Sequence, residues 1–194
     1  MTVIYIRPGN SKGYLRVGVE SDKKYDFTVS ESEYSACGSP LTGDNLTRDS
    51  FDLLYSADMR YKARLKALRI LSFGDNSELM LKRKLLAAGI KRDIIDGVVA
   101  EAVSLGYINA ERQIKKLIIN EVSYNLSGPR KIIPKLINKG YSKSDIEAAI
   151  SQLVDTGEVD FEAAKARLIE SKLPENADEE QIKKLLYKNG YYVC

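Results

Sequence analysis

Residues Leu81–Ile108 read LKRKLLAAGIKRDIIDGVVAEAVSLGYI, and residues Ile132–Val159 read IIPKLINKGYSKSDIEAAISQLVDTGEV, so the chain uses one pattern twice. A fixed period of this length is typical of a helical unit that is repeated and packs on its neighbours. A shift of 51 residues superposes two glycines and a series of apolar positions: Leu85 on Leu136, Gly89 on Gly140, Ile95 on Ile146, Val99 on Ile150, Val103 on Val154, Gly106 on Gly157.

Each copy of the pattern predicts three helices in about 50 residues. In the first copy Leu81, Leu85 and Ala88 share one helical face, and Gly89 stands where a left-handed residue ends a helix. A second helix then runs to Gly106, and another amphipathic stretch precedes the pair. The predicted core residues of that preceding stretch are Leu65, Leu68 and Leu71 in the first copy and Ile114, Leu117 and Ile118 in the second. Four residues of the two paired helices are also expected in the core: Leu85, Val99, Leu136 and Ile150.

A third copy begins at Asp160 and is shorter than the other two. Ala163, Ala164 and Leu168 give its first apolar face, and Gly190 lies 50 residues after Gly140. Because the sequence ends at Cys194, the third copy has no room for its last helix.

The first 29 residues predict strands instead of helices. Apolar residues alternate with polar ones at Val3, Tyr5, Leu15, Val17 and Val19, and Lys24–Val29 predicts a third strand. Ser30 and Glu33 form a capping-box pattern for a short helix through Ala36, and Thr47 is a predicted cap of a long helix. The predicted fold is mainly α: an elongated tandem array of three-helix repeats, the third truncated, preceded by a small N-terminal β-rich element. The expected domains are residues 1–58, 59–108, 109–158 and 159–194.

The composition predicts a cytoplasmic protein. No run of about 18 apolar residues is present, and the N-terminus lacks the pattern of a signal peptide. Cys37 and Cys194 are far apart, which fits a reducing compartment better than a disulfide framework.

The residues that usually carry catalysis or bind metals are scarce. There is no histidine, no second cysteine pair and no GxxxxGK[ST] phosphate loop. The acidic residues lie at helical spacing among lysines, as on solvated helix faces. We therefore expect a protein that is not an enzyme and has no cofactor. Tyr107 and Tyr141 directly follow helix-ending glycines, and the simplest interpretation is that they pack as caps.

The charge is concentrated in the middle of the chain. Residues 60–139 contain 17 basic and 7 acidic residues, a net charge of +10, whereas residues 1–59 and 140–194 are both acidic. This block is either a set of solvated helix faces or a contact surface for a polyanion or an acidic partner. Arg64 matches Lys115 and Lys84 matches Lys135 under the 51-residue shift. The candidate partner-binding residues are Arg64, Lys82, Lys84, Lys115, Lys116, Arg130, Lys131, Lys135 and Lys139.

Three local strings stand out: Ser77-Glu78 followed by Leu81 and Lys84-Leu85, then Gly106-Tyr107-Ile108-Asn109, and Gly128-Pro129-Arg130-Lys131-Ile132 followed by Leu136 and Lys139-Gly140. Together with the repeats, they resemble the RecX family of recombination regulators over about residues 60–191. The chain departs from the family pattern at Asn76, at Phe73-Gly74, and at Ala110 with Gln113-Ile114, and its third repeat stops early. It therefore resembles a divergent member.

The resemblance implies a non-enzymatic modulator of the RecA recombinase. Such a protein binds RecA and RecA–DNA filaments, lies in the filament groove, and inhibits ATP hydrolysis and strand exchange. The expected partners are the RecA filament and single- or double-stranded DNA; no membrane is involved, and the protein is expected to be a monomer. Two alternatives remain open: a direct nucleic-acid-binding helical-repeat protein without a RecA target, and a general helical-repeat scaffold. Reversing the charges of Lys131 and Lys135 together is expected to weaken filament binding without unfolding the chain.

Overall fold

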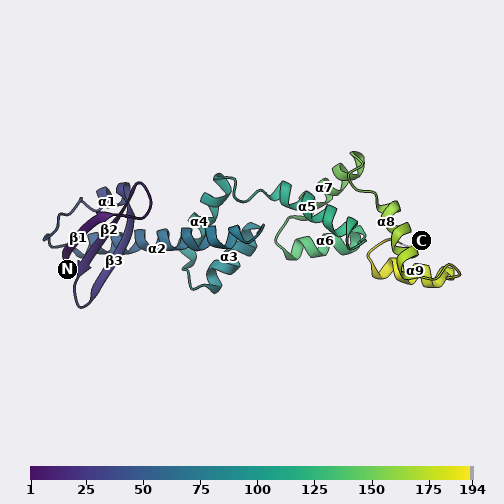
Figure 1. Ribbon diagram of the computed structural model, residues 1–194, viewed down its shortest axis with the longest axis horizontal. Helices are drawn as coiled ribbons and strands as arrows, with labels where there is room; N and C mark the ends of the chain where they lie inside the picture. The colour runs from purple at the N-terminus through teal and green to yellow at the C-terminus, as the bar shows by residue number, and fades with distance from the viewer. Residues whose placement is uncertain (193–194) are drawn as a thin grey trace. The chain divides into compact units, whose positions relative to one another are not determined.

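The computed structural model describes residues 1–192, which are mainly helical after a small N-terminal sheet (Figure 1). Cys194, invoked above as evidence of a reducing compartment, lies outside the described residues. Strands β1 (Thr2–Pro8), β2 (Tyr14–Glu20) and β3 (Lys24–Ser30) pair antiparallel in the order β1-β2-β3. The helices are α1 (Glu31–Ala36), α2 (Arg48–Ser72), α3 (Glu78–Ala87), α4 (Arg92–Ser104), α5 (Ala110–Ser123), α6 (Pro129–Asn138), α7 (Lys143–Asp155), α8 (Phe161–Lys172) and α9 (Glu179–Lys188). The predicted fold class, helical repeats preceded by a β-rich element, is confirmed.

The chain divides into two compact units. The first comprises Met1–Phe73 and Lys82–Glu101; the second comprises Gly74–Leu81 and the chain from Ala102 onward. The division therefore cuts α3 and α4. Of the expected domain boundaries, the one after residue 58 falls inside α2, and those after residues 108 and 158 fall in the connections before α5 and α8. Among the described residues, no helix is long and apolar enough to cross a membrane.

The sheet packs one face against the start of α2. Strand alternation turns Val17, Val19 and Phe27 to the same side, where they form a buried cluster with Phe51 and Leu54 of α2. The caps of the neighbouring helices are as predicted. Ser30 and Glu33 make a reciprocal capping box at α1, and the Thr47 side chain accepts a hydrogen bond from the Ser50 N–H at α2.

The middle helix of each repeat ends in the same way. Gly89, Gly140 and Gly190 have φ angles of +81°, +92° and +87°, a region that favours glycine. In each case the residue after the glycine donates its backbone N–H to a leucine carbonyl of the preceding turn: Ile90 to Leu85 at 3.1 Å, Tyr141 to Leu136 at 3.2 Å, and Tyr191 to Leu186 at 3.0 Å. The expected equivalence of these helix ends is confirmed.

Most of the predicted core residues are buried. Leu85 and Leu136 are fully buried, Val99 is nearly so, and Ile150 packs partly buried against the core of the second unit. The prediction for the late part of α2 was wrong. Leu65 and Leu68 are 49% and 44% exposed, and α2 buries Ala63 and Ala67 instead. Periodicity found a helix there but chose the wrong face, because alanine allows closer packing than leucine and does not stand out as apolar. Four smaller assignments were also wrong, since Ala88, Val103, Val154 and Ala163 are exposed.

Within the second unit, the middle helices of successive repeats meet end to end. The start of α6 contacts the end of α9: the Gly128 N–H donates to the Asn189 carbonyl at 2.7 Å and the Arg130 N–H to the Gly190 carbonyl at 3.0 Å. A Cβ added to Gly128 would lie 2.4 Å from the Gly190 carbonyl oxygen, so only glycine fits there. The same junction joins the start of α3 to the end of α6.

At that second junction, the Ser77 hydroxyl donates to the Lys139 carbonyl and caps α3 by accepting from the Met80 N–H. A Cβ added to Gly140 would lie 2.5 Å from the Cβ of Leu79. Ser77 and Leu79 correspond to Gly128 and Arg130 under the 51-residue shift. Equivalent positions therefore meet at both junctions, with a side-chain donor at one and backbone donors at the other.

Candidate partner-binding surface

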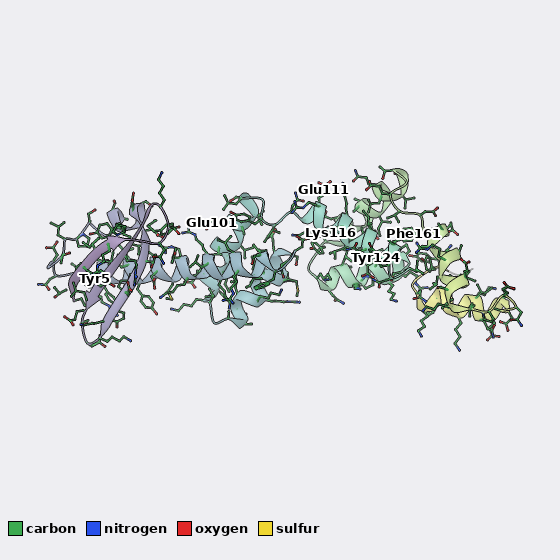
Figure 2. All side chains as sticks on the ribbon, in the orientation of Figure 1. Tyr5, Glu101, Glu111, Lys116, Tyr124 and Phe161 are labelled. Atoms are coloured by element: carbon green, nitrogen blue, oxygen red, sulfur yellow. The ribbon has the colours of Figure 1, made fainter. Side chains whose placement is uncertain are left out.

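Two of the predicted basic residues in the first unit, Arg64 and Lys82, form ion pairs between helices. Arg64 of α2 donates through Nε to Glu101 of α4 at 2.6 Å; Glu101 is labelled in Figure 2. Burial disfavours the charged guanidinium, but the hydrogen bond that Glu101 accepts and the charge of its carboxylate outweigh this effect, so the pKa of Arg64 is raised. Lys82 of α3 lies 2.7 Å from Asp96 of α4. Lys84 is exposed on the same helix as Lys82.

Lys115 and Lys116 of α5 are also paired. Lys115 Nζ lies 2.7 Å from Glu111 one turn earlier, and Lys116 Nζ lies 2.8 Å from Asp75; Glu111 and Lys116 are labelled in Figure 2. The hydrogen bond and charge of Lys115 lower the pKa of the Glu111 carboxyl. These two lysines therefore have intramolecular partners that a binding partner would have to replace.

Lys135 has a structural role that its sequence position did not reveal. Its Nζ lies 2.5 Å from Oε1 of Glu121, whose side chain is only 9% exposed. The Ser127 hydroxyl donates to the other carboxylate oxygen of Glu121 at 3.4 Å. A nearly buried carboxylate is costly without a counter-charge, so Lys135 supports the packing of α5 on α6.

Arg130, Lys131 and Lys139 differ from the residues above. Among residues 1–192, none of these three side chains forms an ion pair with a carboxylate. The Arg130 guanidinium lies 4.6 Å from the ring centre of Tyr187 and 5.6 Å from that of Tyr192. Lys131 Nζ lies 3.4 Å from the Asn189 side-chain oxygen, and Lys139 is exposed at the end of α6. Among the six predicted residues of the second unit, these three therefore need not break an ion pair to bind a partner.

The structure thus separates the predicted residues into two groups. Arg64, Lys82 and Lys84 belong to the first unit, and the other six belong to the second. Sequence reasoning missed the exposed tyrosines at Tyr187 and Tyr192. The signal was present as aromatic residues interleaved with lysines near the end of the chain, but the acidic balance of residues 140–194 directed attention elsewhere.

Equivalent cavities lie between the first and third helices of two repeats. One, of about 320 Å³, is lined by Arg64, Gly97 and Glu101 among others. The other, of about 360 Å³, is lined at the matching positions by Lys115, Ala148 and Gln152. The small residues at the middle position, Gly97 and Ala148, keep both cavities open. Each repeat therefore presents a basic side chain beside a similar concavity.

Comparisons with known proteins agree with the resemblance noted in the sequence. No family model matches the chain. It is 31% identical over 173 residues to regulatory protein RecX of Clostridioides difficile (strain 630), which covers 89% of this chain and 79% of that protein. Regulatory protein RecX of Caldanaerobacter subterraneus is 25% identical over 89% of this chain and 85% of its own length. That of Listeria welshimeri is 26% identical, and the chain spans only 61% of its length.

Solved structures share the fold. A crystal structure of regulatory protein RecX superposes with a TM-score of 0.75 over 98% of this chain and 94% of its own, at 21% sequence identity. The crystal structure of RecX from Lactobacillus salivarius superposes with a TM-score of 0.59 over 70% of this chain and 90% of its own, at 22% identity.

Proposed function

The chain belongs to the RecX family of regulatory proteins, and on that premise we propose that it is a non-enzymatic regulator of the RecA recombinase. It binds RecA and RecA–DNA filaments and inhibits RecA ATP hydrolysis and strand exchange. The observation that carries this proposal is the similarity to the Clostridioides difficile protein over most of both chains. Its place of action is the cytoplasm, where the RecA filament forms.

The repeated architecture supports a repeating partner. Arg64 and Lys115 occupy equivalent positions beside equivalent cavities in two repeats. A filament presents the same surface on each of its subunits, so contacts that are weak individually add up through effective concentration. A partner with a single small epitope has no such use for matched sites.

Within the second unit, the accessible cations Arg130, Lys131 and Lys139 are the preferred contact residues. Binding an acidic surface or a phosphate backbone there breaks no carboxylate pair among residues 1–192. Contacts through Lys115 or Lys116, by contrast, compete with Glu111 and Asp75. Exposed cations mainly raise the association rate and make binding salt-dependent.

The test is RecA ATPase activity on DNA, with the DNA in excess and this protein substoichiometric. We expect inhibition by the wild type, and inhibition weakened about tenfold or more by the pair Lys131→Glu and Lys139→Glu. A matched control reverses two exposed charges of α8, Arg167→Glu and Lys172→Glu, which are absent from the proposed surface. Equal inhibition by both double variants would remove these lysines from the proposal, and no inhibition by the wild type would reject RecA as the target.

Lys135 is excluded from that test by its contact with Glu121 at 2.5 Å. A glutamate at position 135 would face a nearly buried carboxylate and destabilise the junction of α5 and α6. Loss of activity in such a variant would therefore report unfolding as well as lost binding. The double variant Lys131→Glu with Lys139→Glu is therefore a better test than the charge reversal of Lys131 and Lys135 that the sequence suggested.

A second candidate function is nucleic-acid binding without a RecA target. The specific observation in its favour is the side-by-side arrangement of Arg130 with two exposed tyrosines. Under this alternative, RecA is inhibited only when the protein saturates the DNA. Titration at two DNA concentrations separates the cases, because the inhibitory concentration then follows DNA instead of RecA.

A further inference from the structure

Five residues at the junction of α6 and α9 form what we call the Arg130 cluster: Arg130, Lys131, Lys184, Tyr187 and Tyr192. The Arg130 guanidinium lies over the Tyr187 ring at 4.6 Å and near the Tyr192 ring at 5.6 Å. Both rings remain largely in solvent, at 60% and 69% exposure. Lys184 is exposed three residues before Tyr187, on the same side of α9.

Backbone contacts hold the start of α6 against the end of α9. Arg130 donates its N–H to the Gly190 carbonyl, and Gly128 donates its N–H to the Asn189 carbonyl. The close approach at Gly128 and Gly190 admits no side chain at either position. Arg130 on α6 and Tyr187 on α9 are therefore presented together by two rigid elements, as binding sites require.

The junction itself has no need of this arginine. At the equivalent junction of α3 and α6, the position of Arg130 is occupied by Leu79. There the Ser77 hydroxyl donates to the Lys139 carbonyl, and Leu79 lies against Gly140 without a cation or an aromatic partner at that position. An exposed cation–π contact also contributes only about 0.5–1 kcal/mol. Packing thus explains the glycines of the junction but leaves the arginine and its tyrosines without a structural role.

The chemistry of the cluster matches a polyanion that carries aromatic groups. A cation–π contact uses the face of the guanidinium and leaves its N–H donors at the edge, where they can hold phosphate oxygens. Helix α6 contains no acidic residue, and Lys131 and Lys184 add two further cations. The exposed tyrosine rings offer stacking surfaces that unpaired bases can use, whereas bases in a duplex are already stacked.

We propose that the Arg130 cluster binds single-stranded DNA directly, with phosphates on Arg130, Lys131 and Lys184 and a base stacked on Tyr187. This deepens the proposed function, on which it rests, by assigning the DNA contact of the regulator to one end of the second unit. Sequence preference is weak in this arrangement, because every base has a face that stacks.

The test is fluorescence anisotropy of a fluorescein-labelled oligo-dT strand with the full-length chain and no RecA, between about 50 and 200 mM salt. Tyr187→Leu should weaken binding about fivefold or more, and Tyr187→Phe should preserve it, because stacking needs the ring and not the hydroxyl. Arg130→Leu, the residue type of the equivalent Leu79, should lower the slope of log affinity against log salt by about 0.7.

Two matched controls lie outside the cluster: Tyr107→Leu removes another exposed tyrosine, and Arg167→Leu another exposed arginine. Both should bind the strand as the wild type does, and circular dichroism should show all variants folded. Wild-type affinity in folded Tyr187→Leu and Arg130→Leu variants would overturn the inference, as would a wild type that does not bind the strand.

The RecA ATPase assay separates this inference from the proposed function. Cluster variants that lose oligo-dT binding support the inference whether or not they still inhibit RecA. If the cluster variants bind oligo-dT normally but no longer inhibit RecA, the cluster contacts protein, and the inference fails while the proposed function stands. If oligo-dT binding depends on the cluster and the wild type does not inhibit RecA, the inference stands and the proposed function fails.

Discussion

The repeats α2–α4 and α5–α7 have equivalent helix ends but different polar chemistry. Leu85 and Leu136 are both fully buried, and Gly89 and Gly140 both have positive φ. The matched cations diverge, because Arg64 pairs with α4 whereas Lys115 pairs within its own helix. A repeat thus preserves what the backbone and core need, and its polar positions are free to change.

Lys135 gives the clearest case of this divergence. It holds the nearly buried Glu121, and the position equivalent to Glu121 in the first repeat is Ile70. The same position of the repeat is therefore apolar in the first copy and charged in the second. Equivalence of position does not imply equivalence of function among the basic residues.

The largest expected effect tests the part that the repeats share. Leu85→Ala and Leu136→Ala should each reduce the free energy of unfolding by about 2–5 kcal/mol, because each leaves a cavity at a fully buried position. Chemical denaturation of both variants measures this. A loss below about 0.5 kcal/mol for either one would show that the two positions are not equivalent in packing.

The next effect tests where the repeats differ. Lys135→Ala should reduce the free energy of unfolding by about 1–3 kcal/mol, because it leaves the nearly buried Glu121 carboxylate without its counter-charge. Lys131→Ala, on an exposed side chain of the same helix, is the control and should change little. Adding Glu121→Gln to Lys135→Ala should recover part of the loss. Equal stability of the two lysine variants would contradict a structural role for Lys135.

A smaller effect compares the tyrosines after two helix-ending glycines. The Tyr141 hydroxyl donates to Gln113 Oε1 at 2.8 Å, and the Tyr191 hydroxyl donates to the Leu126 carbonyl at 3.1 Å. Each Phe variant should lose about 1 kcal/mol. Tyr141→Phe should lose more, because the Gln113 Nε2 already has no hydrogen-bond partner in the part of the chain that the structure describes. Thermal denaturation that ranks Tyr191→Phe as the less stable variant would reverse this interpretation.

The smallest expected effect concerns the exposed pair in α5. Lys115 lowers the pKa of Glu111, so the carboxylate stays charged in the folded protein to a lower pH than in the unfolded chain. Its contribution to stability is therefore present above the ordinary glutamate pKa and is lost as pH falls through the lowered value. In Lys115→Ala, NMR titration should show the pKa of Glu111 raised towards its ordinary value. An unchanged Glu111 pKa would mean that the ion pair does not persist in solution.

The backbone features were predictable because they depend on local chemistry. Gly89 and Gly140 correctly predicted helix ends with a left-handed residue, and Ser30 with Glu33 correctly predicted a capping box. Pro134 lies inside α6, a helix of only ten residues. These effects act over a few residues, so neighbours in sequence contain the necessary information.

The polar contacts were not predictable, because they join residues that are distant in sequence. Arg130 meets Tyr187 through the α6–α9 junction, and Lys116 meets Asp75 across 41 residues. Charge counting marked the basic block but could not separate Lys135, which pairs with the nearly buried Glu121 carboxylate, from Lys131, which bonds the neutral Asn189 side chain. The buried alanine face of α2 was missed for another reason, because Leu65 and Leu68 are the more apolar residues of that stretch.

The two end-to-end junctions have a consequence for how a gene of this kind can evolve. Deleting or duplicating one whole 51-residue repeat would keep the reading frame. The joints are not interchangeable, however. A serine like Ser77 placed at Gly128 would drive its Cβ into the Gly190 carbonyl, whereas a glycine at Ser77 would lose the hydroxyl that bonds Lys139. The residues at each junction therefore fix the order of the repeats. A gene in which the repeats are exchanged is expected to encode a chain with a steric clash at one junction and a missing hydrogen bond at the other.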